Sequence, residues 1–217
     1  MEKKITNKEL LGYLKSLNFG SGFIDRLKII YRPVVCPFAE LISLVNPGER
    51  VGDVGCGSGQ FCLLLSKFAQ PSFIYGIEIS DRLVKNAESL FTKYGNAAYK
   101  FELFDGVHFP DMIAEMDVIF LNDVLHHVPR QVQERFIQDL IKKMKPGARF
   151  ILKDIEGGTP LVYWNKMHDL VFAGEIGNEL VSSKAKEWLE RNNLIITEFE
   201  KKQMYVYHHY TIVAKKP

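Results

Sequence analysis

The stretch Val51-Gly52-Asp53-Val54-Gly55-Cys56-Gly57-Ser58-Gly59 decides the fold of this chain. The mainly apolar residues 50–54 predict a buried parallel strand. Three glycines then occupy alternate positions, and residues 60–69 predict a helix with one apolar face. A strand, a glycine turn and a helix N-terminus together allow bare backbone to approach a ligand closely. The turn is therefore the first candidate for a binding site.

The glycine spacing and the neighbouring charge restrict the ligand. A dinucleotide fingerprint has glycine at its first, third and sixth positions, but the sixth position counted from Gly55 is Gln60. The Gly-Lys-Ser/Thr ending of a phosphate-binding loop is missing here. Asp53 would repel a pyrophosphate but suits a cationic ligand. S-adenosylmethionine is such a ligand, since it carries an ammonium and a sulfonium and no phosphate. A nicotinamide-dependent oxidoreductase on a similar sheet remains an alternative.

Residues 53–59 resemble the first motif of the class I S-adenosylmethionine-dependent methyltransferases. The family usually has a larger apolar residue where this chain has Gly52, and the glycine weakens the strand slightly. The resemblance implies S-adenosyl-L-methionine as the cofactor. It implies cofactor contacts in this stretch from Asp53, Gly55, Cys56, Gly57 and Gly59.

The resemblance continues at three later strand ends. Glu78 lies near the end of a strand predicted at 72–79 and would accept the ribose hydroxyls, or else cap the next helix. Asp105 follows a strand predicted at 99–104 and matches the acid that bonds the adenine amine, or else is a turn aspartate. The tract from Asn122 follows a strand predicted at 116–121 and matches the family segment beside the transferable methyl. The implied contacts at these ends are Glu78, Ile79, Asp105, Gly106, Asn122 and Asp123.

Strand and helix patterns alternate along the chain, as a doubly wound sheet requires. We predict an α/β fold with a mostly parallel, seven-stranded, Rossmann-like sheet, closed by an antiparallel hairpin of residues 195–204 and 205–214. A helix is predicted from Pro129 to Met144. Residues 49–217 would form the methyltransferase domain. Residues 1–48 would form a helical extension that begins with a capping box at Thr6 and serves as a lid, a packing element or a dimer face.

Composition excludes several functional classes. The formal net charge is only +2 over 217 residues and the lysine pairs form no long basic stripe, so no nucleic-acid partner is expected. Cys36, Cys56 and Cys62 have no metal-ligand spacing and predict reduced thiols of a cytoplasmic protein without a metal site. No apolar run is long enough to span a membrane, and the N-terminus lacks the core of a signal peptide.

The predicted reaction is an in-line displacement at the sulfonium methyl, for which the protein supplies alignment and excludes water. An oxygen acceptor would gain from a base, and the candidates are His127, in the tract with His126, and His168. Each could instead be a packed histidine. Aromatic residues of the N-terminal extension and of residues 160–174 favour a small, partly apolar acceptor: Phe19, Phe23, Tyr31, Tyr163, Trp164 and Phe172. A non-catalytic binding subunit of the same fold remains an alternative function. A homodimer remains an alternative to a monomer.

Overall fold

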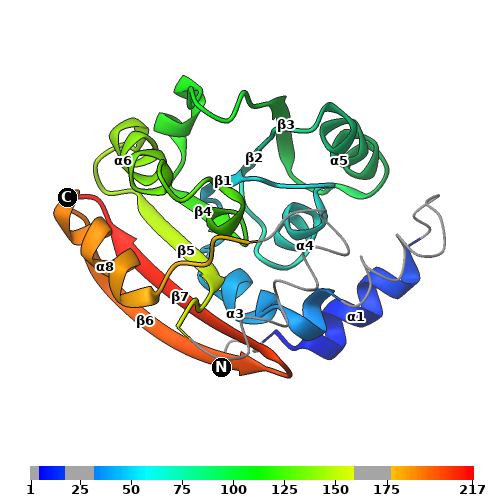
Figure 1. Cartoon of the computed structure of the whole chain (residues 1–217). Coiled ribbons are helices and arrows are strands. Elements are labelled where there is room, and N and C mark those ends of the chain that lie inside the picture. Colours follow the sequence, from blue (N-terminus) through cyan, green and yellow to red (C-terminus); the bar gives the residue numbers. More distant parts are fainter. Residues whose placement is uncertain (1–4, 18–31, 159–176) are drawn as a thin grey trace.

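A seven-stranded sheet organises the chain in the computed structural model, which describes residues 5–17, 32–158 and 177–217 (Figure 1). The strand order is β3-β2-β1-β4-β5-β7-β6. The first five strands pair in parallel, and β7 runs antiparallel between β5 and β6. The predicted doubly wound fold and closing hairpin are confirmed. The strands are β1 Arg50–Val54, β2 Phe73–Glu78, β3 Ala98–Leu103, β4 Val118–Asn122, β5 Arg149–Ile155, β6 Ile195–Met204 and β7 Tyr207–Lys215.

The helices begin where their local signals predict, with one exception. The capping box is present at the start of α1, where the Thr6 hydroxyl accepts from the Glu9 amide and the Glu9 carboxylate accepts from the Thr6 amide. The helix predicted from Pro129 to Met144 is present, but its predicted start is wrong: α6 begins at Gln133, whose side-chain amide donates to carbonyl groups of the preceding turn. The described helices are α1 Asn7–Ser16, α3 Phe38–Ser43, α4 Gln60–Phe68, α5 Asp81–Tyr94, α6 Gln133–Lys143 and α8 Ser182–Arg191, with short 3-10 turns η1 Asp111–Glu115 and η2 Leu125–His127.

Each face of the sheet is covered by its own apolar core, as the near-continuous apolar strands require. Alternate residues of β4 illustrate the division: Phe120 points into the core under α1, α3, α4 and α5, while Ile119 and Leu121 point into the core under α6 and α8. Figure 1 shows these two groups of helices on opposite sides of the strands. No helix within the described ranges is both long and apolar enough to cross a bilayer.

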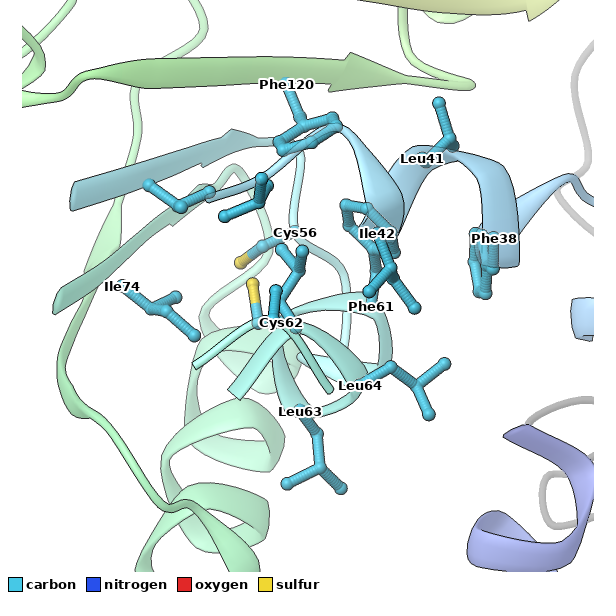
Figure 2. Close-up of a cluster of buried hydrophobic side chains, with 14 of the residues drawn as sticks. Phe38, Leu41, Ile42, Cys56, Phe61, Cys62, Leu63, Leu64, Ile74 and Phe120 are labelled. Carbon is cyan, nitrogen blue, oxygen red and sulfur yellow. The ribbon is translucent and has the colours of Figure 1, made fainter. Parts of the chain in front are cut away.

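The described part of the N-terminal extension is built into one of these cores. The Phe38 ring of α3 lies 5.0 Å from the Phe61 ring of α4, which in turn lies 5.1 Å from the Phe120 ring of β4. Figure 2 shows α3 contributing Phe38, Leu41 and Ile42 to this cluster. The division into residues 1–48 and 49–217 stays a prediction, and residues 1–4 and 18–31 of the extension lie outside the described residues.

Candidate functional site

The glycine turn after β1 adopts backbone conformations that other residues reach only with strain. Gly55, Gly57 and Gly59 have φ values of 75°, 55° and 77°. A Cβ on Gly55 would lie 2.4 Å from Cγ2 of Val124, and one on Gly59 would lie 2.9 Å from Cβ of Ala87. A Cβ on Gly57 would meet no atom within 4 Å. The first and third glycines therefore permit close packing, whereas Gly57 leaves space open.

That space is a cavity of about 230 Å³ beside the turn. Five of the predicted cofactor contacts line it: Asp53, Gly55, Cys56, Gly57 and Asn122. Arg32 of the N-terminal extension also lines it, and sequence reasoning missed this residue. Nothing in the local sequence marks Arg32, because it comes from a segment far from the motifs in the chain. The fold thus brings a cation and an anion to one cavity.

Asp53 is the anion of this cavity, although burial weakens its charge. The carboxylate accepts a hydrogen bond from Sγ of Cys62 at 3.2 Å. Burial raises its pKa to about 7, against the opposing effects of the Cys62 bond and of Arg32. The group therefore changes charge near neutral pH, and a cationic ligand would favour its ionised form.

Glu78 at the end of β2 supports the glycine turn. Its carboxylate accepts from the Gly57 amide at 3.0 Å and from the Ser80 amide at 3.1 Å. The second bond is a local contact in the turn before α5 and not a helix cap, because Ser80 is the N-cap residue of α5 and no described side chain caps this helix. The next residue, Ile79, is 69% exposed and offers an apolar surface at the same edge of the sheet.

Asp105 serves its own turn in the free protein. Oδ1 accepts from the amides of Val107 and His108 at 2.8 and 2.7 Å, and Oδ2 lies 2.6 Å from Nδ1 of His108. The amide and ring of His108, together with the Val107 amide, lower the pKa of Asp105 to about 2. Gly106 follows with a φ of 83°. A role of these two residues toward adenine stays a prediction.

Asn122 and Asp123 leave the end of β4 in different environments. Asn122 is 7% exposed and lines the cavity, and both polar atoms of its side chain lack a hydrogen-bond partner among the described residues. Asp123 lies 2.5 Å from Nζ of Lys153 and 3.6 Å from the Arg32 guanidinium. Burial alone would raise the pKa of Asp123, but Lys153 and Arg32 hold it well below its usual range. An unsatisfied buried amide is costly, so the two polar atoms of Asn122 are available to a ligand in the cavity, and its role as a cofactor contact stays a prediction.

Sequence reasoning also missed Lys153, although a signal was present. Lys153 lies in β5 directly after three apolar residues and is 0% exposed, and a fully buried lysine requires a partner. The run of residues 150–155 could therefore have marked this lysine as a member of a charged cluster.

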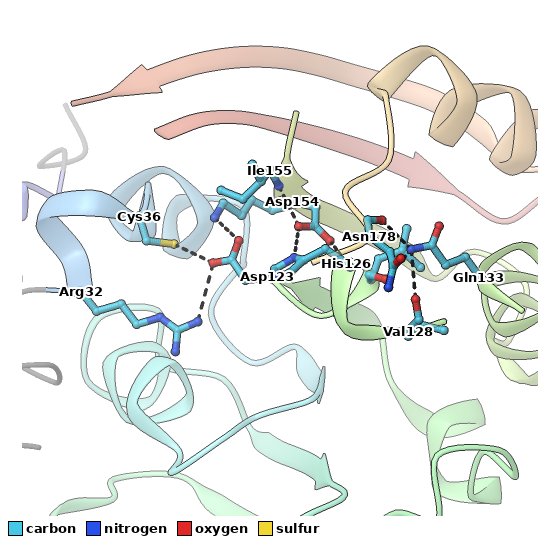
Figure 3. A network of polar contacts seen from close by, with 11 residues as sticks. Arg32, Cys36, Asp123, His126, Val128, Gln133, Asp154, Ile155 and Asn178 are labelled. Carbon is cyan, nitrogen blue, oxygen red and sulfur yellow. Dashed lines mark hydrogen bonds and ion pairs between the residues drawn. The ribbon is translucent and has the colours of Figure 1, made fainter. Parts of the chain in front are cut away.

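The histidine tract separates into one buried and one exposed ring, and Figure 3 shows the buried one, His126, beside Asp154. The buried His126 bonds Asp154 through Nδ1 and through its backbone amide, the latter at 3.1 Å. His127 is exposed, and its ring centroid lies 4.1 Å from that of His126. The imidazole that a carboxylate orients is thus His126. A catalytic role for His127 stays a prediction, and His168 lies outside the described residues. Across the described ranges, no group of three or more histidine, cysteine, aspartate or glutamate side chains is placed to hold a metal.

Comparisons with known proteins agree with this architecture. Residues 45–209 match the family described as "Methyltransferase domain". A 27-O-demethylrifamycin SV methyltransferase of Amycolatopsis mediterranei is 30% identical over 157 residues, which cover 67% of this chain and 54% of the relative. An arsenite methyltransferase of Halobacterium salinarum is 24% identical over 126 residues, which cover 58% of this chain and 32% of the relative. The chain thus spans between a third and about half of the length of these curated relatives.

Solved structures resemble the chain over nearly its whole length. A magnesium protoporphyrin IX methyltransferase from Synechocystis PCC 6803 with bound SAH superposes with a TM-score of 0.68 at 21% identity, covering 99% of this chain and 96% of that one. A SAM-dependent methyltransferase from Methanosarcina mazei superposes with a TM-score of 0.67 at 18% identity, covering 82% and 96%. The family match, the sheet order and the glycine turn agree, and this chain belongs to the class I S-adenosylmethionine-dependent methyltransferases.

Proposed function

We propose that this protein transfers a methyl group from S-adenosylmethionine to a small, partly apolar molecule. The observation that carries the proposal is the cavity at the glycine turn, in which Asp53, Arg32 and the unpartnered Asn122 amide face one space. Opposite charges in one cavity suit a zwitterion. The amino-acid end of S-adenosylmethionine is one, and family membership supports this cofactor.

The residues present fit that cofactor. The ammonium of the cofactor would approach Asp53, and its carboxylate would approach Arg32. The side-chain N and O of Asn122 would form hydrogen bonds to the same ligand. Each Glu78 oxygen accepts a hydrogen bond from one backbone amide, so a lone pair on each remains for ribose hydroxyls without loss of the Gly57 contact. The exposed Ile79 would pack against the adenine ring.

When bound, S-adenosylmethionine supplies an electrophilic methyl and a sulfonium that leaves as a neutral thioether. The chain then has to orient the acceptor and exclude water. For a hydroxyl acceptor, a positioned base would take the proton, and the geometry favours His126 over the predicted His127 because Asp154 fixes its ring. The aromatic surface proposed for the acceptor lies outside the described residues, and its support remains the sequence.

Calorimetric titration with S-adenosylhomocysteine tests the cofactor assignment. We expect saturable binding by the wild-type protein. We also expect Asp53→Ala and Arg32→Ala to weaken it at least tenfold, since each loses a charged hydrogen bond worth about 1.5–3 kcal/mol. Lys142→Ala is the control, because that lysine is exposed and pairs with Asp139 on the surface of α6, away from the cavity lining. Binding of NADH in its place would overturn the proposal in favour of the oxidoreductase.

A transfer assay with methyl-labelled cofactor tests the acceptor class. Phenolic and lipid-like hydroxyl compounds should take up label, and polar amines of similar size should not. Cofactor binding with no transfer to any compound would favour the non-catalytic binding subunit. Transfer to polar amines alone would contradict the proposed acceptor.

A further inference from the structure

The segment after β4 contains a backbone strain that the site described above does not explain. Asp123 has a φ of 54°, in the left-handed region that residues other than glycine seldom adopt, although asparagine and aspartate enter it more often than the rest. Strain of this kind persists where surrounding contacts enforce it, and it gathers at functional sites. The residue that enforces it is therefore of interest.

We propose that Lys153 is a positioning residue for the cofactor site and acts by holding Asp123 in this left-handed conformation. The inference rests on the proposed function, because it takes the cavity at the glycine turn as the cofactor site. It adds a residue that touches no part of that cavity: Lys153 is not among the residues that line it.

Lys153 holds both the side chain and the main chain of Asp123. Its ammonium lies 2.5 Å from Oδ1 of Asp123, and its carbonyl accepts from the Asp123 amide at 2.9 Å. The second oxygen, Oδ2, accepts from Cys36 at 3.7 Å and faces Arg32 at 3.6 Å (Figure 3). With Lys153 fully buried and Arg32 half exposed, the lysine contact is the one shielded from solvent.

The conformation of Asp123 determines where its two neighbours lie. Asn122 on one side places its unpartnered amide in the cavity. Val124 on the other side packs so closely on Gly55 that a Cβ there would lie 2.4 Å away. If Asp123 left the left-handed region, the chain direction would change between these residues. Asn122 and Gly55, which both line the cavity, would shift with it.

A buried ion pair could instead serve stability alone, and double variants separate these explanations. Lys153→Met combined with Asp123→Gly, Asp123→Asn or Asp123→Ala removes both charges each time, so no buried charge is left unpaired. Glycine and asparagine enter the left-handed region readily, whereas alanine populates it roughly tenfold less than glycine does. The three double variants thus differ in backbone preference.

Titration of each variant with S-adenosylhomocysteine, alongside thermal unfolding, tests the proposal. We expect the glycine and asparagine double variants to bind within about threefold of wild type, and the alanine double variant to bind roughly tenfold more weakly. Lys142→Met on the surface of α6 should bind as wild type does.

Two results would overturn the proposal. Equal affinity in all three folded double variants would show that the cavity does not depend on the conformation at residue 123. Equal loss in all three would show that the ligand needs the charges themselves. If the wild-type protein binds no S-adenosylhomocysteine, the proposed function fails separately. The unfolding midpoints then decide, because an alanine double variant as stable as the glycine one would exclude a held left-handed conformation.

Discussion

Replacing Gly55 by alanine should damage folding more than binding, and the same change at Gly57 should do the reverse. At Gly55 the left-handed φ of 75° costs an alanine about 1–2 kcal/mol. The added methyl would also lie 2.4 Å from Val124, whose branched side chain has little freedom to move, and such overpacking costs about 1–3 kcal/mol. The expected loss is therefore about 2–5 kcal/mol of the unfolding free energy.

Gly57 is the matched control within the same turn. Its φ of 55° carries the same backbone cost, but its methyl would meet no atom within 4 Å. The loss should stay near 1–2 kcal/mol, the backbone cost alone. The methyl would nevertheless enter the cavity that Gly57 lines, so affinity for S-adenosylhomocysteine should fall at least tenfold.

Urea unfolding measures the first difference, and calorimetric titration measures the second. Because a whole domain of this kind is stable by about 5–15 kcal/mol, a difference of about 1–3 kcal/mol between the two variants is readily resolved. Equal destabilisation by the two substitutions would refute the close contact between Gly55 and Val124. Normal affinity in Gly57→Ala would refute the assignment of this cavity to the cofactor.

Three further predictions concern titratable and buried groups. Burial raises the pKa of Asp53 from 3.8 to about 7, so the unfolding free energy should fall as the pH rises between these two values. Cofactor affinity should instead rise through pH 7, because the ionised carboxylate attracts the ammonium of the cofactor. Asp53→Asn should flatten both pH profiles, the first measured by unfolding and the second by titration. Burial and Lys153 lower the pKa of His209 from 6.5 to about 4, so the neutral ring contributes to the unfolding free energy above pH 6.5, and this contribution is lost as the pH falls toward 4. The acid unfolding transition of His209→Gln should therefore be shallower than that of the wild-type protein. Asp154→Ala removes the acceptor of three buried donors: the amide and Nδ1 of His126 and the amide of Ile155. The unfolding free energy should fall by about 3 kcal/mol or more. A loss below about 1 kcal/mol would show that the contact between His126 and Asp154 does not stabilise the turn η2.

The sequence alone predicted the sheet, the glycine turn and five of the residues that line the cavity. Apolar runs mark buried strands, and the carboxyl ends of neighbouring parallel strands meet at one edge of the sheet. For this reason Asp53 and Asn122, which lie at the carboxyl ends of β1 and β4, could be expected at one site before any contact was known. The glycine turn is likewise a local property, and its position was readable from the spacing of Gly55, Gly57 and Gly59.

Only the tertiary structure decided which charged groups meet. Arg32 reaches Asp123 across 91 positions of the chain, and no local pattern relates the two. The contact between the His126 ring and Asp154 depends on β5, which the fold brings beside the histidine tract. Strand and turn propensities act over a few residues, whereas ion pairing and burial depend on which segments the folded core brings together. The strain at Asp123 and the lysine that holds it are therefore properties of the packed molecule.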